Sequence, residues 1–383
     1  MNPQIYCTAP FNGLTIRENG DVRTCCVGNN TLGNLNNISI DQIEQSHVMR
    51  EIQQDMLSNN PNLKNCKTCL NQEKNYGLAT LRQHYLKYYP TVNPDTLTLK
   101  FIDVRWNNTC NLGCLYCNSD FSSIWENRLG ISRSSLSKPY QDKLLDWILA
   151  RIDHVEEIML VGGEPMLMKQ NYELLRCLPD TTRISIITNL SYDLEKLPCL
   201  PDLLRRPADN VLWNISMENT NERFEYVRSG ASWAQVEKNL NFLIKHWKSS
   251  ISLNMVYSVF SAFDLPDTVE YFDHRGIQKF NLFPINQNST LNIKNLPVSI
   301  QKLAFDQLLK TQQRHLELLH PEDRNLFPLQ GADSLLNSLS IDRIEHPITL
   351  SEFDEKIKWY DQWGDKKFAD LWPDIAQLIR RNL

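Results

Sequence analysis

The stretch Cys110-Asn-Leu-Gly-Cys114-Leu-Tyr-Cys117 holds three cysteines within eight residues. An apolar run from Leu97 to Trp106 precedes it and predicts a β-strand, so the three thiols would lie on the loop that leaves the carboxyl end of that strand. A cuboidal iron–sulfur cluster normally takes four cysteines, one for each iron. Because no fourth cysteine lies nearby in the sequence, the stretch predicts a cluster with one iron left open to a ligand that the protein does not supply.

The main alternative for these three cysteines is a structural zinc site. Such a site would need a fourth Cys or His close by, and the nearest downstream histidine is His154. Three unrelated buried cysteines at this spacing would explain the pattern less well still. The spacing therefore favours a reactive iron–sulfur site.

Size and composition limit the class of protein. The chain has 383 residues with a formal net charge of -5, and 22% of its residues are charged. Its basic residues are scattered, which argues against nucleic acid as a partner because phosphate binding needs a concentrated basic surface. No apolar run reaches the ~20 residues needed to span a bilayer, and no secretory signal is evident at the N-terminus. We therefore expect a cytoplasmic protein without a membrane partner, in which clustered cysteines bind metal instead of forming disulfides.

Residues 1–75 form a block with five further cysteines: Cys7, Cys25, Cys26, Cys66 and Cys69. Alternating apolar and polar residues on both sides of an Asn-Gly pair predict a β-hairpin between the first two, which would bring Cys7 and Cys25 side by side. The Cys66-x2-Cys69 pair would then complete a closed site with four cysteines. Zinc and a 4Fe–4S cluster both suit this set of ligands, and the residues alone do not separate them.

Beyond residue 96, patterns typical of strands and helices alternate, which is the signature of parallel βα units. We expect six strands, at residues 98–106, 155–161, 183–188, 211–217, 251–259 and 278–283. The roughly 190 residues that they span are too few for a full eight-unit barrel, which takes ~250. A long helix over residues 297–320 and a tail with several tryptophans predict a helical C-terminal region.

Polar and glycine-rich residues follow these strands one after another, where α/β proteins bind their ligands. The second strand ends at Gly162-Gly163-Glu164-Pro165, in which paired glycines would let the backbone approach a ligand closely. Asn189 follows the third strand, Ser216 the fourth, and Phe283 lies on the sixth. Arg228 carries a planar fork that suits a carboxylate, although an exposed helical arginine is an equal alternative.

The cysteine loop, with Tyr116 directly before its third cysteine, resembles the signature of the radical S-adenosylmethionine (SAM) enzymes. The resemblance implies that Cys110, Cys114 and Cys117 hold a 4Fe–4S cluster whose open iron is chelated by SAM, and that reductive cleavage of SAM yields a radical that abstracts a substrate hydrogen. It further implies SAM contacts at Gly162, Gly163, Glu164 and Pro165 (amino group), at Ser216 (ribose or carboxylate), at Arg228 (carboxylate), at Tyr116 and Phe283 (adenine) and at the rim residue Asn189.

The N-terminal block is similar to the SPASM/twitch auxiliary-cluster domains of some radical SAM enzymes. The strings Cys7-x2-Pro10-Phe11, Gly20-Asp21-Val22-x2-Cys25-Cys26 and Cys66-x2-Cys69 carry this similarity. It implies a second 4Fe–4S cluster held by Cys7, Cys25, Cys66 and Cys69, with Cys26 as the alternative to Cys25. Such a domain usually follows the radical SAM core, whereas here it precedes it, which opens the question of where the second cluster lies relative to substrate.

These patterns together predict an auxiliary cluster domain over residues 1–75, a linker over 76–96, a partial (β/α)6 TIM-like barrel over 97–296 and a helical region over 297–383. The function implied is SAM cleavage followed by oxidation or other modification of a peptide or protein, with a flavodoxin- or ferredoxin-type protein as electron donor. One alternative is dehydrogenation of a small polar molecule such as an aminocyclitol or a sugar derivative. The alternative outside catalysis is a metal-binding scaffold.

Overall fold

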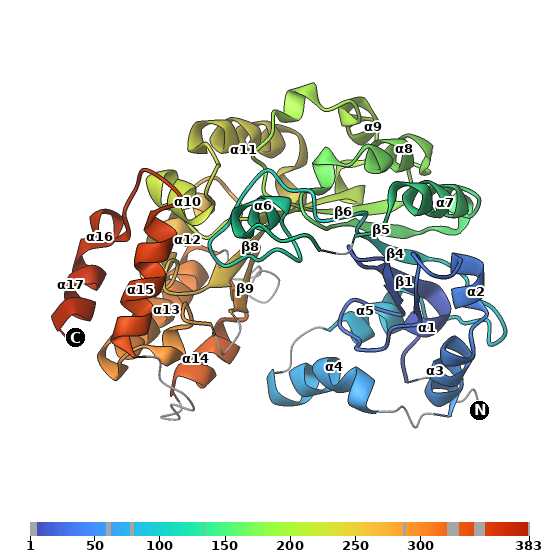
Figure 1. Cartoon of the computed structure of the whole chain (residues 1–383), viewed down its shortest axis with the longest axis horizontal. Helices are drawn as coiled ribbons and strands as arrows, with labels where there is room; N and C mark the ends of the chain where they lie inside the picture. The colour runs from blue at the N-terminus through green and yellow to red at the C-terminus, as the bar shows by residue number, and fades with distance from the viewer. Residues whose placement is uncertain are drawn as a thin grey trace. The chain divides into compact units, whose positions relative to one another are not determined.

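The computed structural model describes residues 6–58, 63–76, 80–133, 135–285, 289–319, 329–340 and 349–381 (Figure 1). The chain divides into two compact units. The first unit comprises Met1–Cys110, Asn118–Thr188 and Lys196–Leu212, and the second comprises Asn111–Cys117, Asn189–Glu195 and Trp213–Leu383. The cysteine loop begins in the first unit with Cys110 and continues in the second.

Six strands form a mixed sheet in the first unit, in the order β3-β2-β1-β4-β5-β6. The strands β1, β4, β5 and β6 run parallel to one another. At the edge, β2 pairs antiparallel with β1, and β3 pairs antiparallel with β2. The bounds are β1 (Gly13–Ile16), β2 (Asp21–Arg23), β3 (Gly33–Asn34), β4 (Phe101–Val104), β5 (Glu157–Leu160) and β6 (Arg183–Thr188).

The two faces of this sheet differ because successive residues of a strand point to opposite sides. One face is apolar and fully buried, with Leu14, Ile16, Ile102, Val104, Ile158, Leu160, Ile184 and Ile186 all at 0% exposure. The other face carries polar side chains such as Thr15, Asp103 and Ser185. A sheet with one apolar and one polar face is expected where the apolar side packs into the core and the polar side faces a site.

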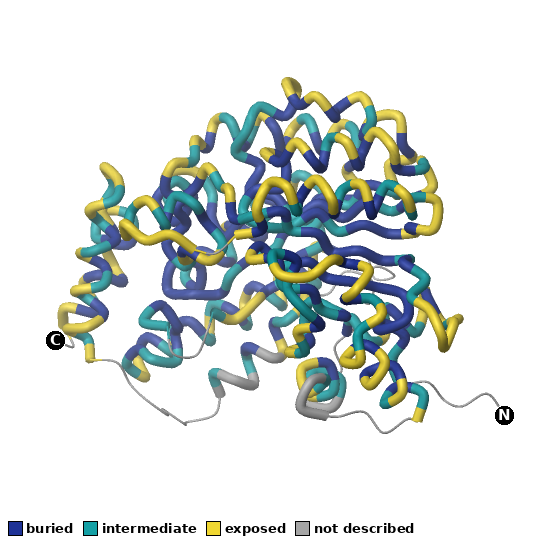
Figure 2. Tube along the Cα trace, turned by 45° about the vertical axis from the view of Figure 1, so that its right-hand side comes forward, coloured by how far each residue is buried: buried dark blue, intermediate teal, exposed yellow. Residues whose placement is uncertain are grey.

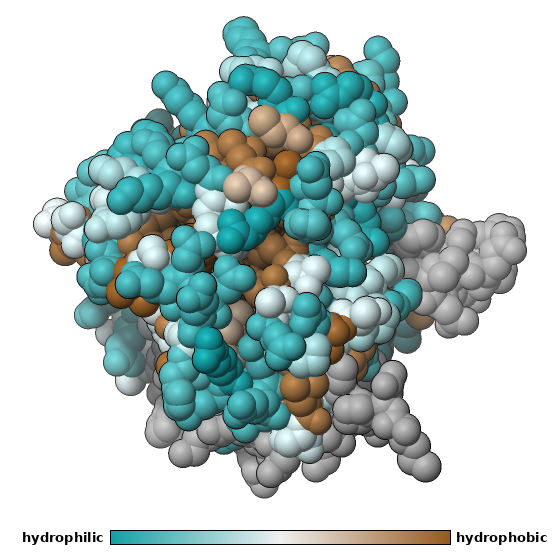
Figure 3. Space-filling view, turned by 90° about the vertical axis from the view of Figure 1, so that its right-hand side faces the viewer, coloured by the Kyte–Doolittle hydropathy of each residue, from teal (hydrophilic) through white to brown (hydrophobic). Residues whose placement is uncertain are grey.

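Helices of the first unit flank the sheet, with α7 and α8 on the side away from α1 and α5 (Figure 1). In Figure 2 the strands of the sheet are mostly dark blue, which marks buried residues, while the outer turns of the helices are yellow, so the core lies along the sheet. Figure 3 shows that the surface on the side of α2 and α7 is mainly hydrophilic, with apolar side chains interspersed. The helices are α1 (Ala9–Asn12), α2 (Ile40–Glu44), α3 (His47–Leu57), α4 (Leu63–Tyr76), α5 (Leu81–Tyr88), α6 (Ser123–Leu129), α7 (Lys138–Leu149), α8 (Lys169–Cys177) and α9 (Leu200–Leu204).

The predicted N-terminal hairpin is present, and its first strand has a further partner. β1 pairs antiparallel with β2 through Thr15↔Arg23 and Ile16↔Val22, and Gly20 adopts the positive φ of 88° that its turn requires. β1 also pairs in parallel with β4 over its whole length, from Gly13↔Phe101 to Ile16↔Val104. The hairpin thus belongs to the same sheet as the strand before the cysteine loop, a pairing of which the sequence pattern gave no indication.

Four parallel strands form the sheet of the second unit, in the order β7-β8-β9-β10. They are β7 (Val211–Ser216), whose first two residues belong to the first unit, β8 (Ile251–Tyr257), β9 (Phe280–Pro284) and β10 (Leu329–Gln330). Together, β4, β5, β6, β7, β8 and β9 confirm all six strands that were predicted from residue 97 onward. β10 was not predicted, because two residues are too short to give a periodic signal.

Helices follow the strands of the second unit and make up its C-terminal region, as the sequence predicted. They are α10 (Asn221–Val227), α11 (Trp233–Trp247), α12 (Leu265–Asp273), α13 (Val298–Leu318), α14 (Ala332–Ser340), α15 (Leu350–Asp361), α16 (Phe368–Leu371) and α17 (Pro373–Arg381). Trp372 is 2% exposed and stacks on Phe368, which fits the packing role expected of the tail tryptophans. None of the helices in the described ranges combines the length and the apolar character that crossing a membrane requires. The α/β class predicted from the sequence is confirmed.

Candidate functional site

The cysteine loop leaves the carboxyl end of β4, as predicted, and the first turn of α6 holds its start. Ser123 opens α6, and its hydroxyl donates to the carbonyl of Cys110 at 3.2 Å, while the Cys110 amide lies 3.1 Å from the same hydroxyl. The Asn108 carbonyl accepts from the Ser123 amide at 2.9 Å. These contacts fix the backbone at the first cysteine without using its sulfur.

The Gly162-Gly163-Glu164-Pro165 turn packs directly against this part of the loop. The Glu164 amide donates to the carbonyl of Thr109 at 2.8 Å. A Cβ atom at Gly163 would lie 2.2 Å from the Thr109 carbonyl oxygen and 2.6 Å from that of Asn108, distances that no side chain tolerates. Glycine is required at position 163 because the backbone of the cysteine loop occupies the space of a side chain. Two motifs that are about fifty residues apart in the sequence therefore form one structure.

Glu164 itself is fully buried, at 0% exposure. Its carboxylate accepts from the Met166 amide at 3.1 Å and from the Thr188 hydroxyl at 2.9 Å, and Thr188 is the last residue of β6. Pro165 is buried next to it and begins a short 3₁₀ turn. The Glu164 side chain thus joins the carboxyl ends of β5 and β6.

The remainder of the cysteine loop, in the second unit, is held against residues 227–230. The Gly113 amide donates to the carbonyl of Ser229, and the Leu115 amide donates to that of Val227, both at 2.9 Å. These two bonds flank Cys114, which is 8% exposed. The Cys117 amide donates to the Cys114 carbonyl at 3.0 Å and turns the loop back on itself.

A buried ion pair lies beside Cys114. The Nε and Nη2 atoms of Arg228 donate to the two carboxylate oxygens of Glu218 at 3.0 and 2.8 Å, and its Nη1 lies 3.7 Å from the Cys114 sulfur. The Tyr116 hydroxyl also donates to Glu218, at 3.0 Å. Burial raises the pKa of the Cys114 thiol, and the positive charge of Arg228 opposes that rise.

The other residues that the sequence singled out lie at the ends of their strands. Asn189 is 6% exposed and donates to the side chain of Asn111 in the cysteine loop at 3.1 Å. Ser216 ends β7 on the half-buried, polar face that also carries Asn254 and Asn281. Phe283, on β9, is 50% exposed. The structure therefore brings Asn189 and Arg228 into contact with the loop that contains Tyr116, and it places Ser216 on β7 and Phe283 on β9.

Sequence reasoning missed two residues of this arrangement, Glu218 and Asn111. Glu218 is 1% exposed and accepts hydrogen bonds from Arg228, Tyr116 and the Val256 amide. An acidic residue directly beyond a strand and ten residues before an arginine was the available signal. Asn111 had no such signal, because its partner Ser191 lies on another loop.

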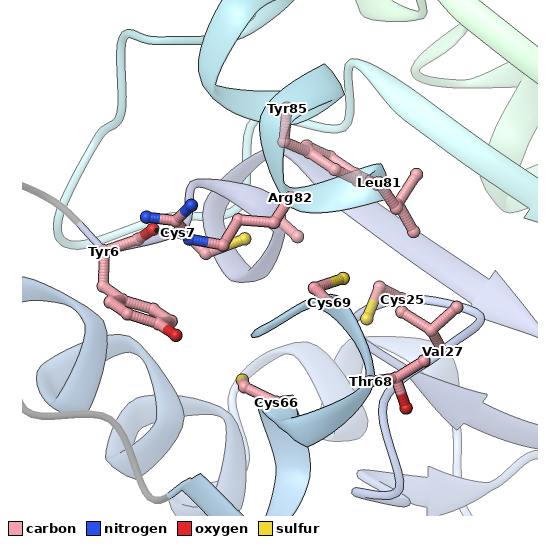
Figure 4. Close-up of a pocket in the computed structure, with 11 residues that line it drawn as sticks. Tyr6, Cys7, Cys25, Val27, Cys66, Thr68, Cys69, Leu81, Arg82 and Tyr85 are labelled. Atoms are coloured by element: carbon pink, nitrogen blue, oxygen red, sulfur yellow. Dashed lines mark hydrogen bonds between the residues drawn. The ribbon is translucent and has the colours of Figure 1, made fainter. Parts of the chain in front are cut away.

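The four cysteines predicted to form a second site line a single cavity in the first unit (Figure 4). The remaining lining residues are Tyr6, Ala9, Val27, Thr68, Leu81, Arg82 and Tyr85. Cys25 lines this cavity, whereas its neighbour Cys26 does not. The thiols border a common space without meeting at one point: within the ranges described above, no three Cys, His, Asp or Glu side chains are placed to hold a single metal ion.

Burial dominates the electrostatics of these thiols. It raises the pKa of Cys7 to about 12 and that of Cys25 to about 11, and the neighbouring sulfurs add to both shifts. Burial also raises the pKa of Cys66, and Cys69 adds to that rise. A cavity lined by four cysteines suits a cationic metal group, which would compensate the charge of the thiolates that bind it.

Strand order relates Cys7, Cys25 and Cys110 to the sheet of the first unit. Cys7 precedes β1 and Cys25 follows the antiparallel β2, so both lie near the amino-terminal end of β1. Cys110 follows β4, which runs parallel to β1. Cys7 and Cys25 are thus connected to the amino-terminal end of β1, whereas Cys110 follows the carboxyl end of β4.

Comparison with protein families gives two matches to this chain. Residues 104–271 match the model of the radical SAM superfamily, and residues 7–70 match SPASM, an iron–sulfur cluster-binding domain. The first range includes the cysteine loop and the Gly-Gly-Glu-Pro turn, and the second includes all four cavity cysteines.

Among curated proteins, a probable GTP 3′,8-cyclase of Methanosarcina acetivorans is 25% identical over 190 residues, which are 48% of this chain and 54% of that protein. One of Halobacterium salinarum is 24% identical over 44% of this chain and 46% of its own. The chain thus spans about half the length of the curated relatives that it matches.

Among solved structures, anSMEcpe with bound AdoMet is 17% identical with a TM-score of 0.43, over 56% of this chain and 60% of its own. Streptococcus suis SuiB bound to S-adenosylmethionine is 15% identical with a TM-score of 0.41, over 73% and 61%.

Proposed function

Because this chain belongs to the radical SAM superfamily and carries an N-terminal iron–sulfur cluster-binding domain, we propose that it is an enzyme that cleaves SAM reductively and removes a hydrogen atom from a bound substrate. In this proposal Cys110, Cys114 and Cys117 hold the cluster that binds SAM. That cluster would supply the electron for the cleavage when it is bound.

The contact between the Gly-Gly-Glu-Pro turn and the cysteine loop is the observation that carries the proposal. A loop that only bound a structural metal would not need the backbone of a second strand end pressed against it with no room for a side chain at Gly163. The contact brings backbone amides and carbonyls of both motifs together at the carboxyl edge of β4 and β5, where ligands bind in parallel α/β sheets.

The donor set fits the cluster. Cys114 is bordered by a guanidinium, which would stabilise a thiolate at that position. In this assignment Gly162, Gly163, Glu164 and Pro165 form the turn that contacts the amino group of SAM, while Asn189 and Ser216 supply polar groups and Tyr116 and Phe283 supply aromatic surface. Nε and Nη2 of Arg228 already pair with the carboxylate of Glu218, so we leave Arg228 out of the groups assigned to SAM.

We assign a second 4Fe–4S cluster to Cys7, Cys25, Cys66 and Cys69. Cys7 and Cys25 are connected to the amino-terminal end of β1 and Cys110 to the carboxyl end of β4, which supports a role of the second cluster in electron supply or in the stability of the fold. A flavodoxin- or ferredoxin-type donor would then provide the electrons.

For the substrate, we propose a peptide or protein. The half-buried faces of β7 and β8 carry amides and hydroxyls, among them Asn214, Ser252 and Asn254, which can bind the peptide groups of an extended segment. A small polar molecule would use the same groups and remains the second candidate. Substrate identity can be tested separately from SAM cleavage.

The decisive experiment is anaerobic reconstitution with iron and sulfide, followed by addition of dithionite and SAM and assay of 5′-deoxyadenosine. We expect product formation by a protein with about eight irons, the content of two cubane clusters. The triple variant with Cys110, Cys114 and Cys117 replaced by Ala should retain about half of the iron and form no product. Cys177→Ala is the matched control, because Cys177 is an exposed thiol outside both groups.

Two results would contradict the proposal. A fully loaded protein that forms no 5′-deoxyadenosine would leave the metal-binding scaffold as the better description. A triple variant that loses all of its iron would contradict the assignment of two independent sites. Incubation with candidate peptides and with aminocyclitols, followed by mass spectrometry for the loss of two hydrogens, would then separate the two substrate classes.

A further inference from the structure

Cys114 is held in a fixed position relative to Arg228. The backbone hydrogen bonds on either side of it, from Gly113 to Ser229 and from Leu115 to Val227, run to the residues on either side of Arg228. Val227 ends α10 and residues 228–230 form a turn, so the two bonds hold the loop against the end of this helix, and the Arg228 side chain reaches the Cys114 sulfur. A Cβ at Gly230 would lie 3.4 Å from the Asn111 carbonyl, which shows how closely the two segments approach.

The donors of Arg228 are divided between two partners. Nε and Nη2 bind the carboxylate of Glu218, and the remaining nitrogen, Nη1, is directed at the Cys114 sulfur at 3.7 Å. Because the guanidinium is planar and rigid, the pairing with Glu218 fixes the direction of Nη1. Glu218 is fixed in turn by the Tyr116 hydroxyl at 3.0 Å and the Val256 amide at 3.2 Å.

The whole arrangement is shielded from water. Arg228 is 4% exposed and Glu218 is 1% exposed. The guanidinium lies between the rings of Tyr116 and Phe224, at 5.6 and 5.8 Å from their centroids. A buried guanidinium without a carboxylate would be costly, whereas the pair is neutral overall and leaves one strong donor for the sulfur.

We propose that Arg228 is a positioning residue that donates a hydrogen bond to the sulfur of Cys114 and thereby raises the reduction potential of the cluster held there. This inference rests on the proposed function. Hydrogen bonds to the sulfur ligands are one of the means by which proteins set the potential of iron–sulfur clusters, because a donor stabilises the more negative, reduced state. Arg228 therefore acts on the sulfur instead of on the carboxylate of SAM, and Glu218 sets its direction.

The test compares Arg228→Met, Arg228→Lys and Glu218→Gln with the wild type, each reconstituted as the full chain. The midpoint potential of the SAM-binding cluster is followed by electron paramagnetic resonance during a redox titration without SAM, and SAM affinity is measured by equilibrium binding. The auxiliary cluster in the same sample is the internal control, because its cysteines have no contact with Arg228 among the interactions described here and its potential should not move.

The proposal predicts shifts of opposite sign. Arg228→Met removes the donor and should shift the potential to a more negative value, with SAM affinity close to that of the wild type. Arg228→Lys keeps a donor and a charge and should recover part of the shift. Glu218→Gln leaves the charge of Arg228 uncompensated beside the sulfur and should shift the potential to a more positive value.

Other outcomes would overturn the inference. If Arg228 instead bound the carboxylate of SAM, Arg228→Met would weaken SAM binding by about tenfold or more and leave the potential measured without SAM unchanged. Equal potentials in all four proteins would also refute it. If Arg228→Met does not retain iron, the positive shift expected of Glu218→Gln still decides the question. A wild type that holds the cluster but forms no 5′-deoxyadenosine would refute the proposed function alone.

Discussion

Replacement of Gly163 by alanine tests the contact on which the site is built. The added Cβ would lie 2.2 Å from the carbonyl oxygen of Thr109, and an ordinary contact begins at 3.4 Å. The turn and the cysteine loop must therefore separate by roughly 1 Å, since the atoms in the way are backbone and cannot rotate aside. Overpacking of this kind costs about 1–3 kcal/mol of stability.

The expected effect on catalysis is larger than the effect on stability. A displacement of about 1 Å at a reacting site can reduce a rate by roughly 100-fold. We expect Gly163→Ala to form 5′-deoxyadenosine at least about tenfold more slowly than the wild type, while the auxiliary site keeps its iron. The assay is the single-turnover rate of 5′-deoxyadenosine formation, combined with iron analysis and a urea denaturation curve.

Gly364→Ala is the matched control. Apart from its neighbours in the chain, no described residue has an atom within 4 Å of a Cβ at Gly364, so this variant should retain the wild-type rate and stability. If Gly163→Ala matched Gly364→Ala in rate and iron content, the close packing of the two motifs would not matter for SAM cleavage. This result would remove the main support for the proposed function.

Three further predictions concern the first unit. Replacement of Cys66 and Cys69 by Ala should remove about half of the iron and leave SAM cleavage with dithionite, because these cysteines line the second cavity and do not belong to the cysteine loop; loss of cleavage would contradict the assignment of two separate clusters. Tyr85→Phe should leave the stability of the metal-free protein unchanged or raise it by about 1 kcal/mol in urea denaturation, because the buried Tyr85 hydroxyl has no hydrogen-bond partner among the described residues. Burial raises the pKa of Glu157, but hydrogen bonds from His84 and Tyr89 and the charge of Arg183 outweigh it and lower the pKa below its ordinary value of 4.5. Because the folded state then binds the proton more weakly than the unfolded state, this carboxylate stabilises the fold above pH 4.5 and loses that contribution as the pH falls further; Glu157→Gln should flatten this part of the stability–pH curve.

Local patterns in the sequence were sufficient for most elements of the fold. The strand Arg183–Thr188 is indicated by its high content of β-branched residues, and Asn19-Gly20 marks the hairpin turn because few other pairs adopt its geometry. The pairing of β1 with β4 could not be foreseen, because it joins Gly13 to Phe101 across 88 positions and a four-residue strand carries no information about its partner.

The same limit applies to the site. The cysteines, the paired glycines and Asn189 could be selected because their residue types and spacing indicate chemistry on their own. The partner of Arg228 could not, because the direction of a long side chain depends on what surrounds it. Its fork suits a carboxylate, as the sequence suggested, and the structure supplies Glu218 of the same chain as one such carboxylate.

The parallel pairing of β1 with β4 has a consequence for how this protein can be divided. If the N-terminal residues were deleted, β4 would become an unprotected edge strand with its backbone groups exposed, a state that favours aggregation. The N-terminal cluster-binding region is thus not a detachable module that could be grafted or exchanged like a domain on a linker. Truncated forms should be insoluble, and any evolutionary gain or loss of this region would have required the neighbouring sheet to be rebuilt at the same time.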